Sequence, residues 1–163
     1  MQPSFGNGEI PAWSLVSNAL ELEHFLPYRL AVLSQRVSRA LARRYEAQFG
    51  IDIPEWRCLA VLGRVTNVTA KDLGARAKLD KVQTSRALRG LVSRGLVERQ
   101  TDPEDRRAVR LRLTEAGHAL YAEVAAVALA WERDLTQALG LSERRAIDRV
   151  LHKLDDALDR LAS

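Results

Sequence analysis

Two helix start signals that lie close together in the middle of the chain constrain its fold more than any other feature. Thr69 stands three residues before Asp72 in "TAKDLGARAKL", and Asp80 stands three residues before Gln83 in "LDKVQTSRALRGL". At this spacing, each side chain can satisfy the backbone N–H group of the other residue. Two short helices must therefore follow each other with few residues between them, which is the arrangement of a helix-turn-helix.

The residues after Gly95 change to the period of a β-strand. Gly95 is placed to end the second short helix. Beyond it, "LVERQT" and "AVRLRL" flank the charged segment "DPEDRR". In the second run, apolar residues alternate with arginines, so one face of the strand is apolar and the other is cationic. This pattern predicts a β-hairpin with a charged tip.

Long amphipathic helices are predicted toward both ends of the chain. The segment "PYRLAVLSQRVSRALARRYEAQFG" has apolar residues at helical spacing and ends at Gly50. Thr114 opens a helix that runs to about Leu139, and Ser142 caps a last helix with its own apolar stripe. A small central unit cannot cover all these stripes, so a symmetric dimer formed through the termini is the simplest solution. A monomeric layer of helices is the alternative.

Charge and composition exclude several classes of protein. The net charge is +4, but residues 71–112 hold twelve Lys and Arg against six Asp and Glu, while the remaining residues hold thirteen against fifteen. This block favours a surface that faces a polyanion, although a solvated charged face is also possible. The single Cys58, three distant histidines and the lack of a glycine-rich phosphate loop give no sign of a disulfide, metal site, cofactor or enzyme. No apolar run suits a signal peptide or membrane span, which predicts a cytoplasmic protein.

The second short helix carries the candidate DNA-binding residues. A helix-turn-helix inserts this helix into the major groove, where its first turns meet the base edges. The candidates are Lys81, Gln83, Thr84, Arg86 and Arg89. Gln83 and Arg86 can read adenine and guanine in a bidentate manner, and the others suit phosphates. Gln83 has an alternative role as the cap partner of Asp80, and Val82 is expected on the inner side of the helix.

The charged hairpin tip has a matching interpretation. A basic hairpin beside the recognition helix can reach the flanking minor groove, where the negative potential attracts arginine. Arg106 and Arg107 are the candidates, and Asp105 is close enough to hold the guanidinium of Arg107 in one orientation. The alternative is that the acidic residues merely neutralise the arginines in an exposed turn.

The run "LDKVQTSRALRGLVSRGLVERQTDPEDRRAVRLRLTEAG" resembles the multiple antibiotic resistance regulator (MarR) family of winged-helix transcription regulators. The similarity covers roughly residues 26–161. It implies a mainly α fold with a small β-hairpin wing, in which residues 51–113 form the winged helix-turn-helix. Residues 26–50 and 114–163 would form the dimerisation region, after an N-terminal arm at 1–25. The resemblance also implies a homodimer that binds a palindromic double-stranded DNA operator, usually as a repressor, and is released by a small, often aromatic ligand.

The segments "FLPYRLAVLSQRVSRA" and "IPEWRCLAVLGR" are similar to those of regulators of aromatic-acid catabolism. This similarity suggests an aromatic carboxylate or an acyl-CoA as the effector, and catabolism or efflux genes as the targets. Aromatic side chains and a cation near the first two helices are candidate ligand contacts, namely His24, Tyr28, Arg29 and Trp56. The alternative is that these aromatics are core residues, as aromatic side chains at helical spacing usually are. Some relatives sense oxidation through a cysteine near the start of the first helix, but this chain has none there, and Cys58 is expected to be buried and inert.

A different class of function also fits the basic block. A winged-helix module with no specific DNA site would use the same face to bind an acidic protein partner. Retention of the gene's upstream DNA in a gel, in the presence of competitor, separates this alternative from a sequence-specific regulator.

Overall fold

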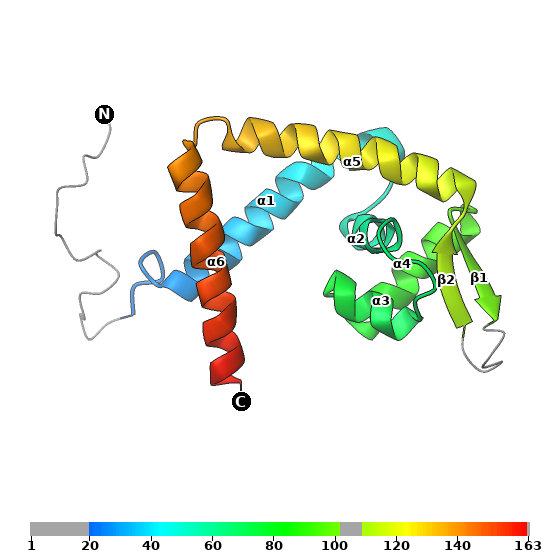
Figure 1. Ribbon diagram of the computed structural model, residues 1–163, viewed down its shortest axis with the longest axis horizontal. Coiled ribbons are helices and arrows are strands. Elements are labelled where there is room, and N and C mark those ends of the chain that lie inside the picture. Colours follow the sequence, from blue (N-terminus) through cyan, green and yellow to red (C-terminus); the bar gives the residue numbers. More distant parts are fainter. Residues whose placement is uncertain (1–19, 102–108, 163) are drawn as a thin grey trace. The chain divides into compact units, whose positions relative to one another are not determined.

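The computed structural model describes residues 20–101 and 109–162, and within them it has the expected mainly α composition with one β-hairpin (Figure 1). The elements are α1 (Leu26–Phe49), α2 (Ile53–Leu62), α3 (Ala70–Ala77), α4 (Lys81–Ser93), β1 (Val97–Thr101), β2 (Val109–Leu113), α5 (Glu115–Thr136) and α6 (Leu141–Leu161). The chain divides into two compact units, Met1–Arg44 and Tyr45–Ser163. Within the described ranges, no helix combines the length and apolar character needed to cross a bilayer.

The described part of the first unit consists of a short turn and most of α1. The backbone N–H group of Phe25 donates to the carbonyl of Glu21 before the helix begins. Leu30 and Leu33 are exposed in the single chain, whereas Ala42 is buried. The apolar stripe expected on this helix is therefore left partly in water.

Hydrogen bonds at the helix starts show which of the expected caps form. In α4, the Asp80 carboxylate accepts from the Gln83 N–H at 2.7 Å, and the Gln83 side chain accepts from the Asp80 N–H at 3.1 Å, so the expected capping box is confirmed. In α3, Thr69 Oγ1 accepts from the Asp72 N–H at 3.1 Å, but the Asp72 carboxylate binds the Thr69 hydroxyl instead of its backbone. Only half of that capping box is present.

The start of α6 differs from the sequence-based expectation. Gly140, not Ser142, is the N-cap residue, because the Gly140 N–H donates to the Glu143 carboxylate at 2.7 Å. The guanidinium of Arg144 donates to the carbonyls of Thr136 and Leu139, which ties the first turn of α6 to the end of α5. The expectation failed because a glutamate three residues after a glycine supplies half of a capping box without a side chain at the cap itself.

Helices α2, α3 and α4 pack together around the core of the second unit. The core includes Leu59, Leu62, Leu73, Leu88 and Leu91, each almost fully buried. The turn between α3 and α4 depends on Gly74, since a Cβ atom there would lie 2.6 Å from Thr84 Oγ1. This close approach allows the two helices to form the expected helix-turn-helix.

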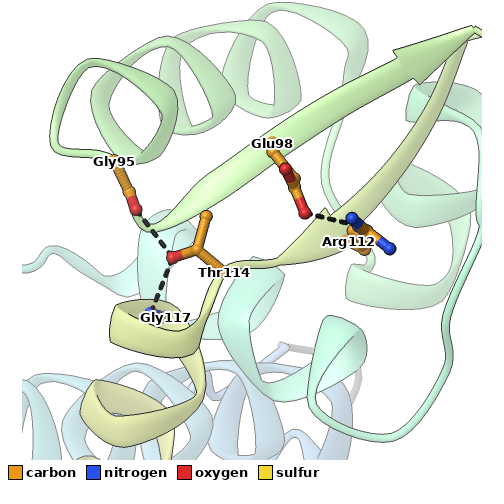
Figure 2. Close-up of polar contacts among 5 residues, drawn as sticks. All are labelled: Gly95, Glu98, Arg112, Thr114 and Gly117. Atoms are coloured by element: carbon orange, nitrogen blue, oxygen red, sulfur yellow. Dashed lines mark hydrogen bonds and ion pairs between the residues drawn. The ribbon is translucent and has the colours of Figure 1, made fainter.

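The hairpin has the strands that the alternating pattern predicts. β1 and β2 are antiparallel, with Val97 opposite Leu113 and Thr101 opposite Val109. On the polar side, Glu98 forms an ion pair with Arg112, its direct partner across the strands (Figure 2). The backbone N–H of Leu111 also donates to the carbonyl of Val68, which attaches the segment before α3 to the hairpin.

Thr114 joins three elements of the second unit (Figure 2). Its hydroxyl donates to the Gly95 carbonyl at 2.7 Å and accepts from the Gly117 N–H at 3.0 Å. Its own N–H donates to the carbonyl of Leu96. The end of α4, the end of β2 and the first turn of α5 therefore share one hydrogen-bonded junction. Gly95 supports the turn with a φ of 68°, a backbone conformation that favours glycine.

We predict that Gly117→Ala destabilises the protein by about 1–3 kcal/mol, because a Cβ atom there would lie 2.0 Å from the backbone oxygen of Leu96. Chemical denaturation followed by circular dichroism measures the change. Gly140→Ala is the matched control, since its nearest atom would lie 3.5 Å away and the substitution should cost less. Equal stability of Gly117→Ala and the wild type would contradict the junction as described.

Candidate nucleic-acid interface

One face of α4 is fully presented to solvent. Val82, Ser85, Arg86 and Arg89 are all exposed, and they follow each other at positions i, i+3, i+4 and i+7 of the helix. Residues with this spacing lie on the same side of an α-helix. The opposite side holds Leu88 and Leu91, which are buried in the core. The capped start of α4 therefore displays a stripe with two arginines.

The expected DNA-binding residues of α4 do not all lie on this exposed side. Lys81, Arg86 and Arg89 are exposed, as the expectation requires. Gln83 is also exposed, but its side-chain oxygen is engaged by the backbone N–H of Asp80. Gln83 therefore has its alternative role as the cap partner of Asp80. The nitrogen of its side-chain amide takes no part in the capping box.

Two expectations for α4 are corrected by its rotational phase. Thr84 was expected to contact phosphate, but it is only 4% exposed and its hydroxyl donates to the Asp80 carbonyl at 2.7 Å. Val82 was expected on the inner side, but its side chain is 76% exposed. Each residue turns the helix by about 100°, so residues i and i+2 lie on nearly opposite sides of it. Because Thr84 is buried, Val82 must therefore face outward.

The hairpin lies beside the start of α4. Arg99 of β1, Lys71 of α3 and Lys81 of α4 line the same cleft, so this strand and both helices of the helix-turn-helix meet there. The candidate tip residues Asp105, Arg106 and Arg107 lie outside the described residues. In the sequence, these residues lie between the end of one described strand, Val97–Thr101, and the start of the other, Val109–Leu113.

The cleft between α3, α4 and β1 was not anticipated from the sequence. It has a volume of about 580 Å³, and its wall combines the apolar Leu79 and Leu88 with three cationic side chains. Arg99 gave no sequence signal, because its strand, Val97–Thr101, shows no regular alternation of apolar and cationic residues. Neither Lys71 nor Arg99 stands in a recognisable motif with α4, so the three cations could not be grouped by spacing.

The residues proposed as ligand contacts are divided between the two units. In the first unit, His24 forms a hydrogen bond with Glu21 at 2.8 Å, and Tyr28 and Arg29 are exposed on α1. Trp56 belongs to the second unit. That these four residues bind one ligand stays a prediction.

Trp56 is the middle member of an aromatic cluster. Its ring lies 6.0 Å from that of Tyr45 and 6.2 Å from that of Tyr121, measured between centroids. Burial, with a smaller contribution from the charge of Glu46, raises the pKa of Tyr45 to about 12, so this phenol stays protonated at neutral pH. At least one face of Trp56 therefore serves packing.

Cys58 is fully buried, as expected. Burial first, and then the negative charges of Asp52 and Glu55, raise the pKa of its thiol from 9.0 to about 12. The thiolate that reacts with oxidants is therefore scarce near neutral pH. Among the residues that the structure describes, no three His, Cys, Asp or Glu side chains gather as candidate metal ligands.

Comparisons with known proteins agree with this architecture. A model of the MarR family matches residues 49–108. A helix-turn-helix transcriptional repressor from Mycobacterium bovis is 30% identical over 131 residues, which cover 80% of this chain and 91% of that protein. The crystal structure of a MarR family transcriptional regulator from Silicibacter pomeroyi has 32% identity and a TM-score of 0.74, and the match covers 86% of this chain and 99% of that one. The structure of MarR from E. coli without ligand has 25% identity and a TM-score of 0.67, covering 79% and 95%.

We predict that Cys58 of the native protein resists a colorimetric thiol reagent such as dithionitrobenzoate at pH 8. A pKa near 12 lowers the thiolate fraction at this pH about a thousandfold relative to a thiol with a pKa of 9.0, and burial blocks access. The same protein in concentrated guanidinium chloride should react with one equivalent at once. Rapid reaction of the native thiol would show that the helix α2 region opens readily.

Proposed function

This chain belongs to the MarR family of transcriptional regulators, and we propose that it acts as a dimeric repressor that binds a palindromic DNA operator. The family consists of DNA-binding regulators rather than enzymes. The observation that carries the proposal is the exposed stripe on α4, which is held in place by the Asp80–Gln83 capping box next to the hairpin. One relative, from Mycobacterium bovis, is a transcriptional repressor, which supports repression rather than activation as the proposed activity.

The roles proposed for α4 follow from side-chain chemistry and exposure. Arg86 would read guanine through its fork of donors, since a guanidinium matches the two acceptors on the major-groove edge of that base. Arg89, at the end of the stripe, and Lys81, next to its first residue in the sequence, would bind phosphates. Gln83 would contribute its amide donors while its oxygen maintains the cap. Thr84 is not included, because its hydroxyl is buried.

The wing is proposed to reach the minor groove beside the α4 site. The family resemblance assigns this role to Arg107, with Arg106 as a second cation and Asp105 as the residue that orients Arg107. The described strands support this proposal, because Thr101 and Val109, which flank these three residues in the sequence, pair at the end of the hairpin away from Thr114.

Dimerisation is proposed on the basis of the apolar surface of α6. No residue of α6 is fully buried in the single chain, and Ile147, Val150, Leu151, Leu158 and Leu161 are 47–84% exposed. A second copy of the chain would cover this stripe. Two copies would also present two α4 helices to half-sites that lie about one helical turn of DNA apart.

The alternative is a winged-helix module that binds an acidic protein through the same cations. It predicts weak DNA binding that any competitor duplex removes. The sequence-specific reading is favoured because the arginines of α4 lie on the exposed face of a helix-turn-helix and the family consists of transcription regulators.

We predict that Arg86→Ala weakens binding to a duplex selected from random DNA by at least about tenfold, because a bidentate contact to a base contributes about 1–3 kcal/mol. Fluorescence anisotropy measures the affinity, and the wild type should bind as two chains per duplex with an affinity that falls steeply as salt increases. Lys153→Ala, which removes an exposed cation from α6, is the control and should leave the affinity unchanged. Equal loss in both variants, or no selected sequence at all, would favour the alternative.

The effector proposed is an aromatic carboxylate or its coenzyme A thioester. The cleft beside α4 supports this class, because a ring can lie against Leu79 and Leu88 while a carboxylate meets Arg99. A ligand there would cover Lys81, which gives a direct reason for release from DNA. The residues His24, Tyr28, Arg29 and Trp56 remain the second proposed location.

We predict that benzoate or phenylacetyl-CoA raises the unfolding temperature in proportion to the logarithm of ligand concentration, and that Arg99→Ala removes the shift. Arg29→Ala is the matched control, because it removes an exposed arginine from the other proposed location. Loss of the shift in Arg29→Ala alone would place the ligand beside α1, and no shift with either compound would reject this ligand class.

A further inference from the structure

Val82 is an apolar side chain at a position where the protein itself does not cover it. It occupies the second position of α4 and is 76% exposed, although Ala87, Leu88 and Leu91 on the inner side of the helix are buried. Single exposed apolar residues are common on protein surfaces, so the exposure alone decides nothing. The informative feature is its place on the stripe, one turn before Arg86 and next to Lys81.

The direction of the Val82 side chain is fixed by two features of the helix start. The capping box between Asp80 and Gln83 holds the backbone on both sides of Val82. A valine within a helix strongly prefers one χ1 rotamer, because of its branched Cβ. The isopropyl group is therefore presented rigidly, while the arginines further along the stripe have long and adaptable side chains.

A rigid apolar group at this position distinguishes the bases by chemistry. The N-terminal residues of a recognition helix meet base edges in the major groove. Thymine is the only one of the four standard DNA bases that presents a methyl group there, and apolar side chains contact it favourably. The amino group of cytosine and the polar edges of the purines would instead lose water against valine without gaining a hydrogen bond.

From this geometry we infer that Val82 is a specificity-determining residue that packs against the C5 methyl group of a thymine in each half-site. This inference rests on the proposed function, and it adds a thymine to the bases that the protein reads in each half-site. Residues in i and i+4 positions are about 6 Å apart, and successive base pairs are about 3.4 Å apart. The thymine therefore lies within about two base pairs of the base that Arg86 reads. Because the Gln83 oxygen is engaged in the cap, Gln83 cannot read adenine in a bidentate manner, and Val82 is the residue that adds a base to the one read by Arg86.

The test removes the methyl group from the DNA and the isopropyl group from the protein in combination. A duplex selected from random DNA by the wild type is prepared with each thymine replaced in turn by deoxyuridine, which keeps base pairing and lacks only the methyl group. Affinities are measured for the wild type, Val82→Ala and Val82→Thr. Alanine removes the contact, whereas threonine keeps a β-branched shape with one methyl group.

At one thymine per half-site, uracil should weaken binding of the wild type about three- to fivefold, the scale expected for one buried methyl group. Val82→Ala should respond less than about 1.5-fold at that position, and Val82→Thr should fall between the two. At every other thymine, the three proteins should respond alike. Unfolding temperatures check that the variants fold. Val82→Ala should not lower the unfolding temperature through the helix, because alanine is a better helix former than valine.

Identical responses of the wild type and Val82→Ala at every thymine would overturn the inference while leaving specific binding, and so the proposed function, intact. Failure of the selection to enrich any sequence would reject the proposed function and this inference together. A position that depends on Val82 but lies far from the base affected by Arg86→Ala would also overturn the assignment, because the two side chains are separated by a single helical turn.

Discussion

The hydroxyl of Thr114 is the contact on which the geometry of the second unit depends. It links the carbonyl at the end of α4 to the first turn of α5, and the strand that precedes it forms one side of the hairpin. Because these are short bonds to backbone groups, contacts among the described residues are enough to hold the hairpin base against α4. The Leu96 carbonyl lies so close to Gly117 that no side chain fits between them. The run "LTEAG" is thus explained by packing: a buried leucine, a cap and a glycine that allows close approach.

The start of α4 serves two requirements that compete for the same side chains. A helix needs its first N–H groups satisfied, and a DNA reader needs polar side chains directed outward. Asp80 and Gln83 meet the first requirement and Arg86 meets the second, while Thr84 is turned inward and bonds to its own helix. This division explains why counting polar residues near a helix start overestimates how many of them are available for DNA.

Local signals in the sequence predicted the helix order, the capping box of α4 and the hairpin, because caps, glycine exits and period-two alternation act over a few residues. Which side of α4 faces the core was harder to predict from the sequence. Val82 and Thr84 exchange their expected sides because burial is decided by what packs against the helix, here Gly74 of α3. The N-cap of α6 moved from Ser142 to Gly140 because Glu143 supplies the bond. The cleft with Lys71 and Arg99 was invisible, since it joins residues from separate elements that share no motif.

The unsatisfied stripe of α6 has a consequence for how such a chain behaves in a cell. None of the 21 residues of α6 is fully buried in its own chain, so this helix receives little of the tertiary packing that stabilises most helices in proteins. If two copies pair through this stripe, as proposed, the order of the helix depends on protein concentration, because a higher concentration favours the dimer. In such a dimer, a low protein concentration would separate the two α4 helices, and binding to a palindromic operator would decline more steeply than the concentration does.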